Sequence, residues 1–182
     1  VVRSMAKHKN ICNYIHLPVQ SGSNRILKEM NRQHTREEYI KLIDDIKQII
    51  PDCTISHDLI TGFPTETEDD HKDTLSLMDE VKFSFAYMYK YSERPKTLAE
   101  RKYEDNVPED TKRARLQKVI DLQRKHATES NESCIGKTVK VLIESTSKKT
   151  LYQSMIKAKL QKQFVLIRLP FFPAIQKVCD RQ

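Results

Sequence analysis

The chain has 182 residues, of which 38% are apolar, 31% are charged and only 3 are glycine. This length suffices for one medium-sized domain and a small second one, and the composition is typical of a helix-rich globular protein. No apolar run approaches the roughly 20 residues of a membrane-spanning helix, and the first residues lack the apolar core of a signal peptide. The sequence therefore favours a cytosolic protein that does not enter a membrane.

The formal net charge of +7 comes entirely from the last quarter of the chain. Residues 137–182 carry 10 Lys/Arg and 2 Asp/Glu, whereas residues 1–136 carry 22 and 23. Such a basic segment suits a polyanion such as RNA, and a solvated lysine-rich tail explains the same charge equally well. The 4 cysteines are widely separated, whereas metal and iron–sulfur sites usually draw on close pairs or triplets. No metal site is predicted.

Predicted strands and helices alternate from the start of the chain. An apolar run over Tyr14–Val19 predicts a buried strand, and Ser23–Met30 predicts a short helix that begins at a Ser/Asn cap. Thr35 and Glu38 form a capping box at the start of a second helix, which Pro51 ends. The apolar face of this helix is expected to hold Tyr39, Leu42, Ile43, Ile46 and Ile50.

The next segments repeat this alternation. Cys53–Ile60 is β-branched and predicts a strand, Thr67 with Asp70 caps a further helix, and the aromatic run "FSFAYMYKYS" predicts a third strand. The apolar side of that helix would consist of Leu75, Met78 and Val81. Strands and helices at this spacing indicate right-handed βαβ units and a parallel sheet, which an α/β barrel and an open doubly wound sheet both contain.

The last third changes from helical to alternating periodicity. Residues 108–133 predict one long charged helix after Pro108, with an inner side of Leu116, Val119, Ile120 and Gln123–Ala127. Val139, Val141 and Ile143 then alternate with other residues, so a β-type domain is expected to begin at about Cys134. Beyond Lys148 the pattern supports no fold.

Three polar loops follow the predicted strands: "QSGS", "GFPTET" and "YSERPKTLAE". The carboxyl ends of parallel strands carry the ligand side of such folds, so these loops are expected to converge on one rim. A Gln-Ser-Gly-Ser turn suits a carboxylate, a ribose or a phosphate, although an ordinary capping turn is the commoner explanation. Asp58 lies inside an apolar strand, where a buried carboxylate requires either an interacting partner or a functional role. His16 and His57 are expected to make hydrogen bonds in the core or at the rim.

Three long segments, in this order, resemble one known family. They read "HLPVQSGSNRILKEMNRQHTREEY", "ISHDLITGFPTETEDDHKDTLSLM" and "YMYKYSERPKTLAERKYEDNVPEDTKRARL". They closely resemble the tRNA methylthiotransferases, radical S-adenosylmethionine enzymes that add a 2-methylthio group to N6-isopentenyladenosine next to the tRNA anticodon, at position 37. The resemblance runs from about Asn13 to Ser147. A relative that methylthiolates a ribosomal protein shares parts of these motifs and matches less well.

The resemblance implies an α/β fold: residues 1–133 would be the C-terminal part of a radical SAM partial TIM barrel, closed by the helix over 108–133. Residues 134–182 would be a truncated or divergent TRAM module, a small β-barrel that binds tRNA. It also implies S-adenosylmethionine and four-iron four-sulfur clusters as cofactors of the full-length enzyme. The implied cofactor-binding residues are Gln20, Ser21, Ser23, Asp58, Gly62, Phe63 and Pro64, those on the substrate side are Tyr91, Ser92 and Arg94, and those that contact RNA are Lys137, Lys140, Lys148 and Lys149.

The sequence also departs from the family. Thr65 in "GFPTET" and Lys96 in "RPKT" stand where the family usually has Gly, and the radical-generating C-x-x-x-C-x-x-C loop does not occur in this chain. The chain is therefore expected to be a C-terminal fragment that lacks the cluster ligands and the N-terminal part of the same enzyme, and to be inactive by itself. The alternative is a tRNA-binding remnant without catalysis, which would use residues 137–182.

Overall fold

The computed structural model describes residues 1–8, 10–133, 135, 136, 141–146, 155–160 and 163–168, the last three ranges by their backbone alone. The chain divides into two units, residues 1–135 and 136–182. Each unit has its own sheet, and the two are described separately. Within the described residues, no helix combines the length and the apolar character that a membrane crossing requires.

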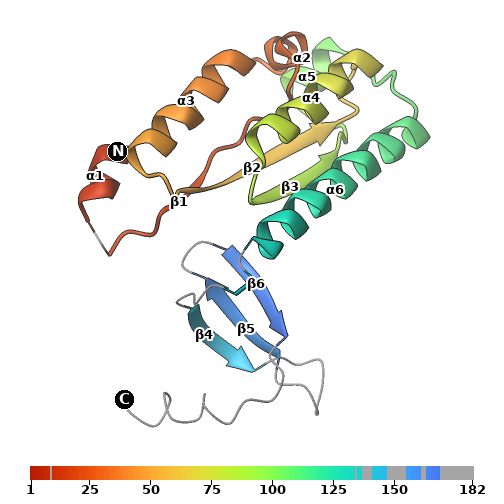
Figure 1. The fold of residues 1–182 in the computed structure, drawn as a ribbon. Coiled ribbons are helices and arrows are strands. Elements are labelled where there is room, and N and C mark those ends of the chain that lie inside the picture. The colour runs from red at the N-terminus through yellow and green to blue at the C-terminus, as the bar shows by residue number, and fades with distance from the viewer. Residues whose placement is uncertain (9, 134, 137–140, 147–154, 161–162, 169–182) are drawn as a thin grey trace. The chain divides into compact units, whose positions relative to one another are not determined.

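The first unit is built on a parallel sheet of three strands, β1 (Tyr14–His16), β2 (Thr54–Thr61) and β3 (Phe85–Lys90), in the order β1-β2-β3 (Figure 1). This confirms the parallel α/β arrangement that the alternating elements predict. The first strand is shorter than predicted, because Pro18 has no N–H to donate to a ladder. Pairing with β2 resumes at Gln20, whose N–H donates to Asp58 O at 2.9 Å.

Six helices accompany this sheet in the described residues, and two of them were not predicted. They are α1 (Val2–Lys7), α2 (Asn24–Glu29), α3 (Arg36–Ile49), α4 (Glu68–Val81), α5 (Leu98–Lys102) and α6 (Glu109–Glu132). The unpredicted helices are α1 and α5, which have six and five residues and no buried side chain. The predicted capping boxes are both present, at Thr35 with Glu38 in α3 and at Thr67 with Asp70 in α4.

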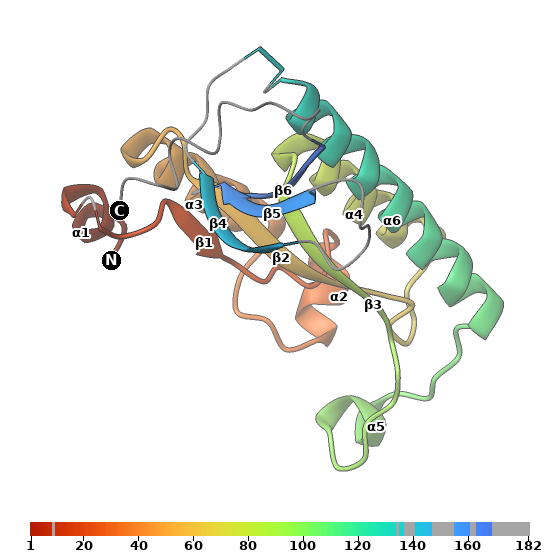
Figure 2. The same ribbon diagram turned by 90° about the horizontal axis from the view of Figure 1, so that it is seen from below.

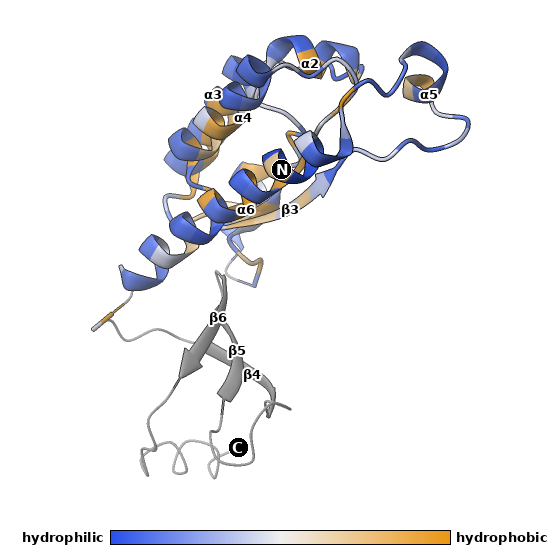
Figure 3. Ribbon diagram, turned by 90° about the vertical axis from the view of Figure 1, so that its right-hand side faces the viewer, coloured by the Kyte–Doolittle hydropathy of each residue, from blue (hydrophilic) through white to orange (hydrophobic). Residues whose placement is uncertain are grey.

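The main core lies between the sheet and the helices α3, α4 and α6. Its buried residues come from these helices, from β2 and from the segments after β1 and before β3, and they include Val19, Ile43, Leu59, Met78, Phe83 and Val119. Figure 2 shows α4 and α6 side by side, and Figure 3 shows their hydrophobic residues as bands that alternate with hydrophilic ones. The aliphatic residues on these bands bury their apolar area against β2, which is the main stabilising term for the unit.

Two predictions of burial are wrong. Tyr14 in β1 is 43% exposed and Leu42 in α3 is 44% exposed. Tyr14 lies on the sheet face opposite the core, together with Phe85, Tyr87 and Tyr89 of β3, all of which are exposed. Leu42 lies outside the contact that α3 makes through Tyr39, Ile43 and Ile46.

The inner side of α6 is more polar than predicted. Its buried residues are Lys112, Arg115, Val119, Gln123 and His126, whereas the predicted Leu116 and Ile120 are only half-buried. The charged residues are buried because they face carboxylates of the neighbouring loops. The hydrophobic pattern therefore located the inner side correctly at Val119, Gln123 and His126, and it missed the charged residues on the first turns of the helix.

The second unit contains an antiparallel sheet of three strands in the order β4-β5-β6. The strands are β4 (Val141–Thr146), β5 (Met155–Leu160) and β6 (Gln163–Arg168). The predicted strand is present at β4, and two further strands follow in the region for which the sequence supported no fold. Val139 and the four lysines assigned to RNA lie outside the described residues, so their roles stay predictions.

His57 in β2 belongs to the core, as predicted, but the hydrogen bond predicted for it is absent among the described residues. Its ring lies 3.6 Å from the Phe83 ring, centroid to centroid. Gln123 is close by but donates its amide to Phe83 O, and neither ring nitrogen of His57 has a hydrogen-bond partner among the described residues. Burial disfavours the charged imidazole and lowers the pKa of His57 to about 3. The folded state therefore keeps this histidine neutral.

We expect His57 to weaken the fold in acid. An unfolded chain protonates this ring near its ordinary pKa of 6.5, whereas the folded chain does so only near 3, so stability falls as the pH drops through this interval. The loss is up to about 1.4 kcal/mol per pH unit. His57→Leu should reduce the fall in the free energy of unfolding between pH about 6.5 and about 4.5, measured by urea titration of the 182-residue chain. The control His8→Leu changes an exposed histidine. An unchanged slope in His57→Leu would contradict this account.

Candidate cofactor and substrate site

A cavity of about 770 Å³ opens at the carboxyl ends of the parallel strands. Six of the ten cofactor and substrate residues that the sequence proposed line it: Gln20, Asp58, Phe63, Tyr91, Ser92 and Arg94. They come from the ends of all three strands and from the loops that follow them. The structure thus brings the three predicted loops together at one rim, as the parallel topology requires.

The serines of the "QSGS" turn do not line this cavity. Ser21 and Ser23 are buried; the Ser23 hydroxyl donates to Asp70 Oδ1 at 2.6 Å, and the Ser23 N–H donates to Ser21 Oγ at 3.2 Å. Ser23 also caps α2, as the sequence predicted. Both hydroxyls are therefore engaged by protein groups, and their assignment to the cofactor stays a prediction.

Gly22 lets this turn approach the backbone of α4. A Cβ atom at Gly22 would lie 2.5 Å from Asp73 O, which no side chain can occupy, and the Gly22 N–H donates to Thr74 Oγ1 at 3.0 Å. The close contact explains why the turn contains glycine. It also fixes Gln20, two residues earlier, at the wall of the cavity.

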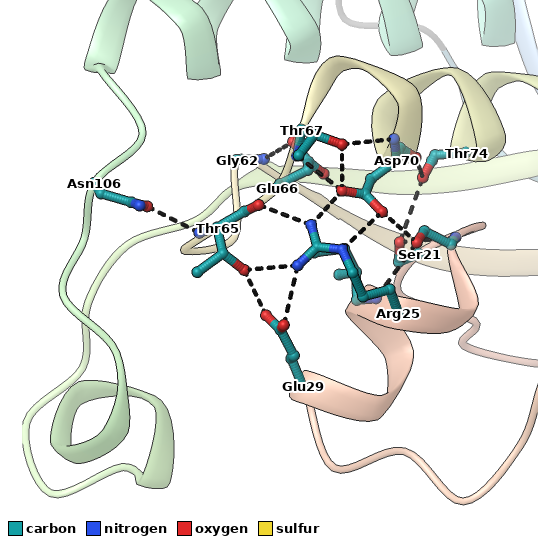
Figure 4. A network of polar contacts seen from close by, with 12 residues as sticks. Ser21, Arg25, Glu29, Gly62, Thr65, Glu66, Thr67, Asp70, Thr74 and Asn106 are labelled. Carbon is teal, nitrogen blue, oxygen red and sulfur yellow. Dashed lines mark hydrogen bonds and ion pairs between the residues drawn. The ribbon is translucent and has the colours of Figure 1, made fainter.

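Arg25 and Asp70 connect the first two loops (Figure 4). Arg25 forms an ion pair with Asp70 and a second one with Glu29, and its Nη2 donates to Thr65 O at 2.7 Å. Asp70 also accepts hydrogen bonds from Ser23 and Thr67. Burial alone would raise the pKa of Asp70, but these donors outweigh it and hold that pKa well below its usual range. The carboxylate is therefore charged at all physiological pH values.

Thr65 adopts a backbone conformation that favours glycine, with φ at 69°. Its N–H donates to Asn106 Oδ1 at 2.8 Å, its hydroxyl donates to Glu29 Oε2 at 2.5 Å, and its carbonyl accepts from Arg25. A β-branched residue in this region costs about 1–3 kcal/mol, so it persists only where its surroundings determine it. These bonds supply that constraint and fix Glu29, which lines the cavity.

Lys96 has the same backbone conformation, with φ at 68°. Both positions at which the sequence departs from the family's glycine therefore adopt the left-handed region. The Lys96 side chain is exposed and has no polar partner among the described residues, whereas its N–H donates to Glu100 Oε2 at 2.8 Å. Thr65 is held by its side chain as well as by its backbone, and Lys96 only by its backbone.

Glu66 ties the second loop to α6. Its side chain is 1% exposed, and its Oε2 lies 2.8 Å from Arg115 Nη1, whose side chain is 7% exposed. The same oxygen accepts the Gly62 N–H at 2.7 Å. Burial raises the pKa of Glu66, and the hydrogen bonds from Gly62 and Arg115 limit this rise. Nothing in the local sequence around Glu66 indicates this pairing, because its partner lies 49 positions further along the chain.

Lys112 supports the side of the cavity that Tyr91 lines. Its side chain is buried, and its Nζ forms ion pairs with Asp105 and Glu109. The stem passes over Gly62 so closely that a Cβ atom there would overlap it, and the Nζ lies 5.6 Å from the centre of the Tyr91 ring. Gly62 is therefore required by close packing as well as by its φ of 73°.

Asp58 points to the uncovered face of the sheet, where it is partly accessible. Its Oδ1 lies 3.5 Å from His16 Nε2, and His16 Nδ1 lies 2.9 Å from Ser56 Oγ. The predicted need for a partner is thus met by His16, and one side of the carboxylate faces the cavity. The described residues contain no group of three or more His, Cys, Asp or Glu side chains that could hold a metal ion.

Three charged residues of the cavity wall, Glu29, Arg32 and Lys90, were not predicted from the sequence, and Lys90 is the last residue of β3. Glu29 is the last residue of α2, and Arg32 lies just beyond it. Neither residue belongs to a loop that directly follows a strand, which is where site residues are normally expected. The length of α2 could have indicated them. A short helix that begins at a strand-end loop can place its last residues back at the same rim.

Comparison with known proteins agrees with this geometry. Residues 1–78 match the sequence profile of the Radical SAM superfamily. Coproporphyrinogen III oxidase of Escherichia coli, a radical SAM enzyme, has a similar fold with a TM-score of 0.54 and 24% identity, over 63% of this chain and 27% of that one. The first unit therefore has a radical SAM fold of the α/β partial-barrel class.

The family follows from more similar sequences. The chain is 67% identical over 150 residues to the tRNA-2-methylthio-N(6)-dimethylallyladenosine synthase of Christiangramia forsetii, and 63% identical over 150 residues to that of Flavobacterium johnsoniae. Each match covers 82% of this chain and 31% of the relative. The relative in Azobacteroides pseudotrichonymphae is 52% identical over 165 residues, with 91% and 36% covered. The chain belongs to the tRNA methylthiotransferase family and spans about a third of these relatives' length.

We expect Lys96→Gly to stabilise the chain. The substitution removes the left-handed strain of a side chain that makes no polar contact among the described residues, and the N–H bond to Glu100 remains. Relief of about 1–2 kcal/mol, less the higher entropy of unfolded glycine, leaves a gain of about 0.5–1 kcal/mol. Thr65→Gly relieves the same strain but loses the hydroxyl bonds to Glu29 and Arg25, so it should give no gain. Urea unfolding of both variants decides this, and equal gains would refute it.

We expect Arg115→Met to destabilise the chain by about 3–5 kcal/mol at pH about 8, because it leaves the buried Glu66 carboxylate without its cation. Loss of the cation allows Glu66 to take up a proton, so the destabilisation should be smaller at pH about 5. The control Arg113→Met removes an exposed pair with Asp110 and should cost less than about 1 kcal/mol. Similar losses in both variants, measured by urea unfolding, would show that the buried pair has no special role.

Proposed function

We propose that this chain is part of a radical SAM tRNA methylthiotransferase, and that its cavity holds S-adenosylmethionine beside the target adenosine. The proposed reaction adds a 2-methylthio group to N6-isopentenyladenosine next to the tRNA anticodon, at position 37. The observation that carries the proposal is the cavity itself, which residues from all three strand ends line. The names of the relatives, which refer to a dimethylallyladenosine of tRNA, support the substrate.

The cavity residues fit S-adenosylmethionine. A volume of about 770 Å³ lies within the usual range for small-molecule sites. Phe63 and Tyr91 are buried and meet edge to face at 5.3 Å, so they form an apolar wall against which an adenine can pack. The Gln20 amide and the Asp58 carboxylate supply polar groups at the opposite strand ends. A carboxylate there suits the α-ammonium group of the cofactor.

The described residues do not fit an iron–sulfur cluster, because they include no group of potential ligands. Within the proposal, the cluster ligands belong to the part of the relatives' length that this chain does not span. The expectation that the chain is inactive by itself remains part of the same proposal.

The chain's own residues would bind and orient the reactants. S-adenosylmethionine in such enzymes supplies a methyl group and a carbon-centred radical. Phe63 and Tyr91 exclude water from one side of the site, while the contacts of Lys112 and Glu66 keep their loops in place. His16 supports Asp58 from behind, so the carboxylate keeps its orientation toward the cavity. The chain therefore contributes pre-organisation rather than the reacting groups.

A tRNA-binding role without catalysis is the second candidate. The specific observation in its favour is the charge of residues 137–182, with 10 Lys/Arg and 2 Asp/Glu. In both cases the partner is tRNA, and a cytoplasmic location follows from the proposal. A TRAM-like module in the second unit belongs to the same proposal, to which the antiparallel strands β4, β5 and β6 lend support.

We expect the 182-residue chain to bind S-adenosylhomocysteine, an unreactive analogue of the cofactor, and Asp58→Asn to weaken this binding about tenfold. Loss of a charge-assisted hydrogen bond of about 1.5 kcal/mol corresponds to that factor. Adenosine, which lacks the ammonium group, should bind both forms equally. Asp44→Asn on an exposed face of α3 serves as the control. Calorimetry measures binding to the unaltered chain and to both variants. Absence of S-adenosylhomocysteine binding to the unaltered chain would refute the cofactor site.

A further inference from the structure

We propose that Arg32 and Arg94 form a phosphate-binding pair at the wall of the cavity, and that they hold the RNA backbone beside the nucleotide that enters it. Both residues line the cavity, Arg32 after α2 and Arg94 after β3. The inference rests on the proposed function in taking RNA as the ligand. It assigns a role to Arg32 and a chemical class of contact to Arg94.

The two guanidinium groups differ from most other arginines of the first unit in having no partner among the described residues. Arg25, Arg36, Arg113, Arg115 and Arg124 form ion pairs, and Arg101 donates to Thr97 O. Among the arginines of the first unit, only Arg3, Arg32 and Arg94 lack a polar side-chain contact with another described residue. Two of these three lie on the cavity wall, where their donors remain available to a ligand.

The acidic groups of the cavity do not compete for them. The Glu29 carboxylate is taken by Arg25 and Thr65, and Asp58 lies beside His16. The third cation of the wall, Lys90, forms an ion pair with Glu109 on α6. Among the described residues, the cavity wall thus keeps two unpaired arginines against one carboxylate, Asp58, that still faces the cavity, so the excess positive charge at its mouth attracts an anion.

The neighbouring rings indicate which anion this is. Tyr89 lines the cavity and is 53% exposed, and it lies on the same sheet face as the exposed Tyr87. Exposed aromatic rings beside unpaired guanidinium groups are the usual combination for single-stranded nucleic acid, in which a base stacks and a phosphate is neutralised. Arginine also matches two phosphate oxygens with its planar fork of donors. A carboxylate, such as that of the cofactor, shares this chemistry.

The test compares two double variants of the complete 182-residue chain with equal loss of charge. Arg32→Gln with Arg94→Gln removes the proposed pair, and Arg3→Gln with Arg113→Gln removes two arginines that lie elsewhere. The ligand is a short RNA hairpin that carries N6-isopentenyladenosine in its loop, titrated by fluorescence anisotropy at several salt concentrations. Two lost phosphate contacts should reduce the slope of log K against log salt concentration by about 1.4. The affinity at moderate salt should fall at least tenfold, and the control should change little.

Four outcomes would overturn the proposal: no binding of the hairpin to the unaltered chain, no effect of the pair, an equal effect of the control, or weaker binding of S-adenosylhomocysteine with unchanged RNA binding. The last outcome would assign the arginines to the cofactor's carboxylate. Binding of S-adenosylhomocysteine to the unaltered chain is measured in parallel. The cofactor site can therefore stand when the phosphate site fails, and the two failures are distinguishable.

Discussion

The carboxylate of Asp70 is the group on which the geometry of the cavity depends. It caps the start of α4, accepts from Ser23 in the first loop and pairs with Arg25, which in turn holds Thr65 in the second loop. Two loops that are about forty residues apart in sequence are thereby joined through one buried charge. Such a group has no water to replace a lost partner, so each of its bonds is required by the others.

The same principle attaches α6. Arg115 and Lys112 lie on the inner side of a helix that is otherwise charged on its outer side, and each is paired with a carboxylate of a loop. Apolar contacts at Val119 anchor the middle of the helix and would tolerate some sliding. The ion pairs define the register, because a buried guanidinium displaced by one turn would lose Glu66. The helix therefore acts as a strap that sets the position of Gly62 and Tyr91 at the cavity.

Local signals in the sequence were sufficient for most of the first unit. Capping boxes at Thr35 and Thr67, the β-branched strand β2 and the strand–helix spacing lead directly to a parallel α/β sheet. The resemblance to the methylthiotransferases went further: the two positions at which glycine is usual, Thr65 and Lys96, both have a left-handed backbone. Sequence patterns report such constraints because each constraint depends on a few consecutive residues.

Contacts between distant segments could not be predicted in the same way. The serines of the first loop were assigned to the cofactor, yet Ser23 binds Asp70 of α4, 47 positions away. Lys112 and Arg115 were not among the predicted inner residues of α6, because a charged residue on an amphipathic helix normally faces water and only a carboxylate from another segment reverses that preference. Arg32 was not predicted as a site residue for the opposite reason: an arginine without a partner produces no recognisable pattern in the sequence.

The two faces of the sheet have different roles. Parallel sheets are normally covered on both sides, but α3, α4 and α6 cover only the face of Ile55 and Leu59, within the part of the chain that the structure describes. The other face presents Tyr14, Phe85 and Tyr87, and it leads without interruption to Asp58 and the cavity. Aromatic rings tolerate this exposure better than aliphatic side chains because tyrosine hydroxyls can remain hydrated. The covered face thus explains why the strands hold their positions, and the uncovered face leaves their carboxyl ends accessible at the cavity, where the proposed nucleotide would bind.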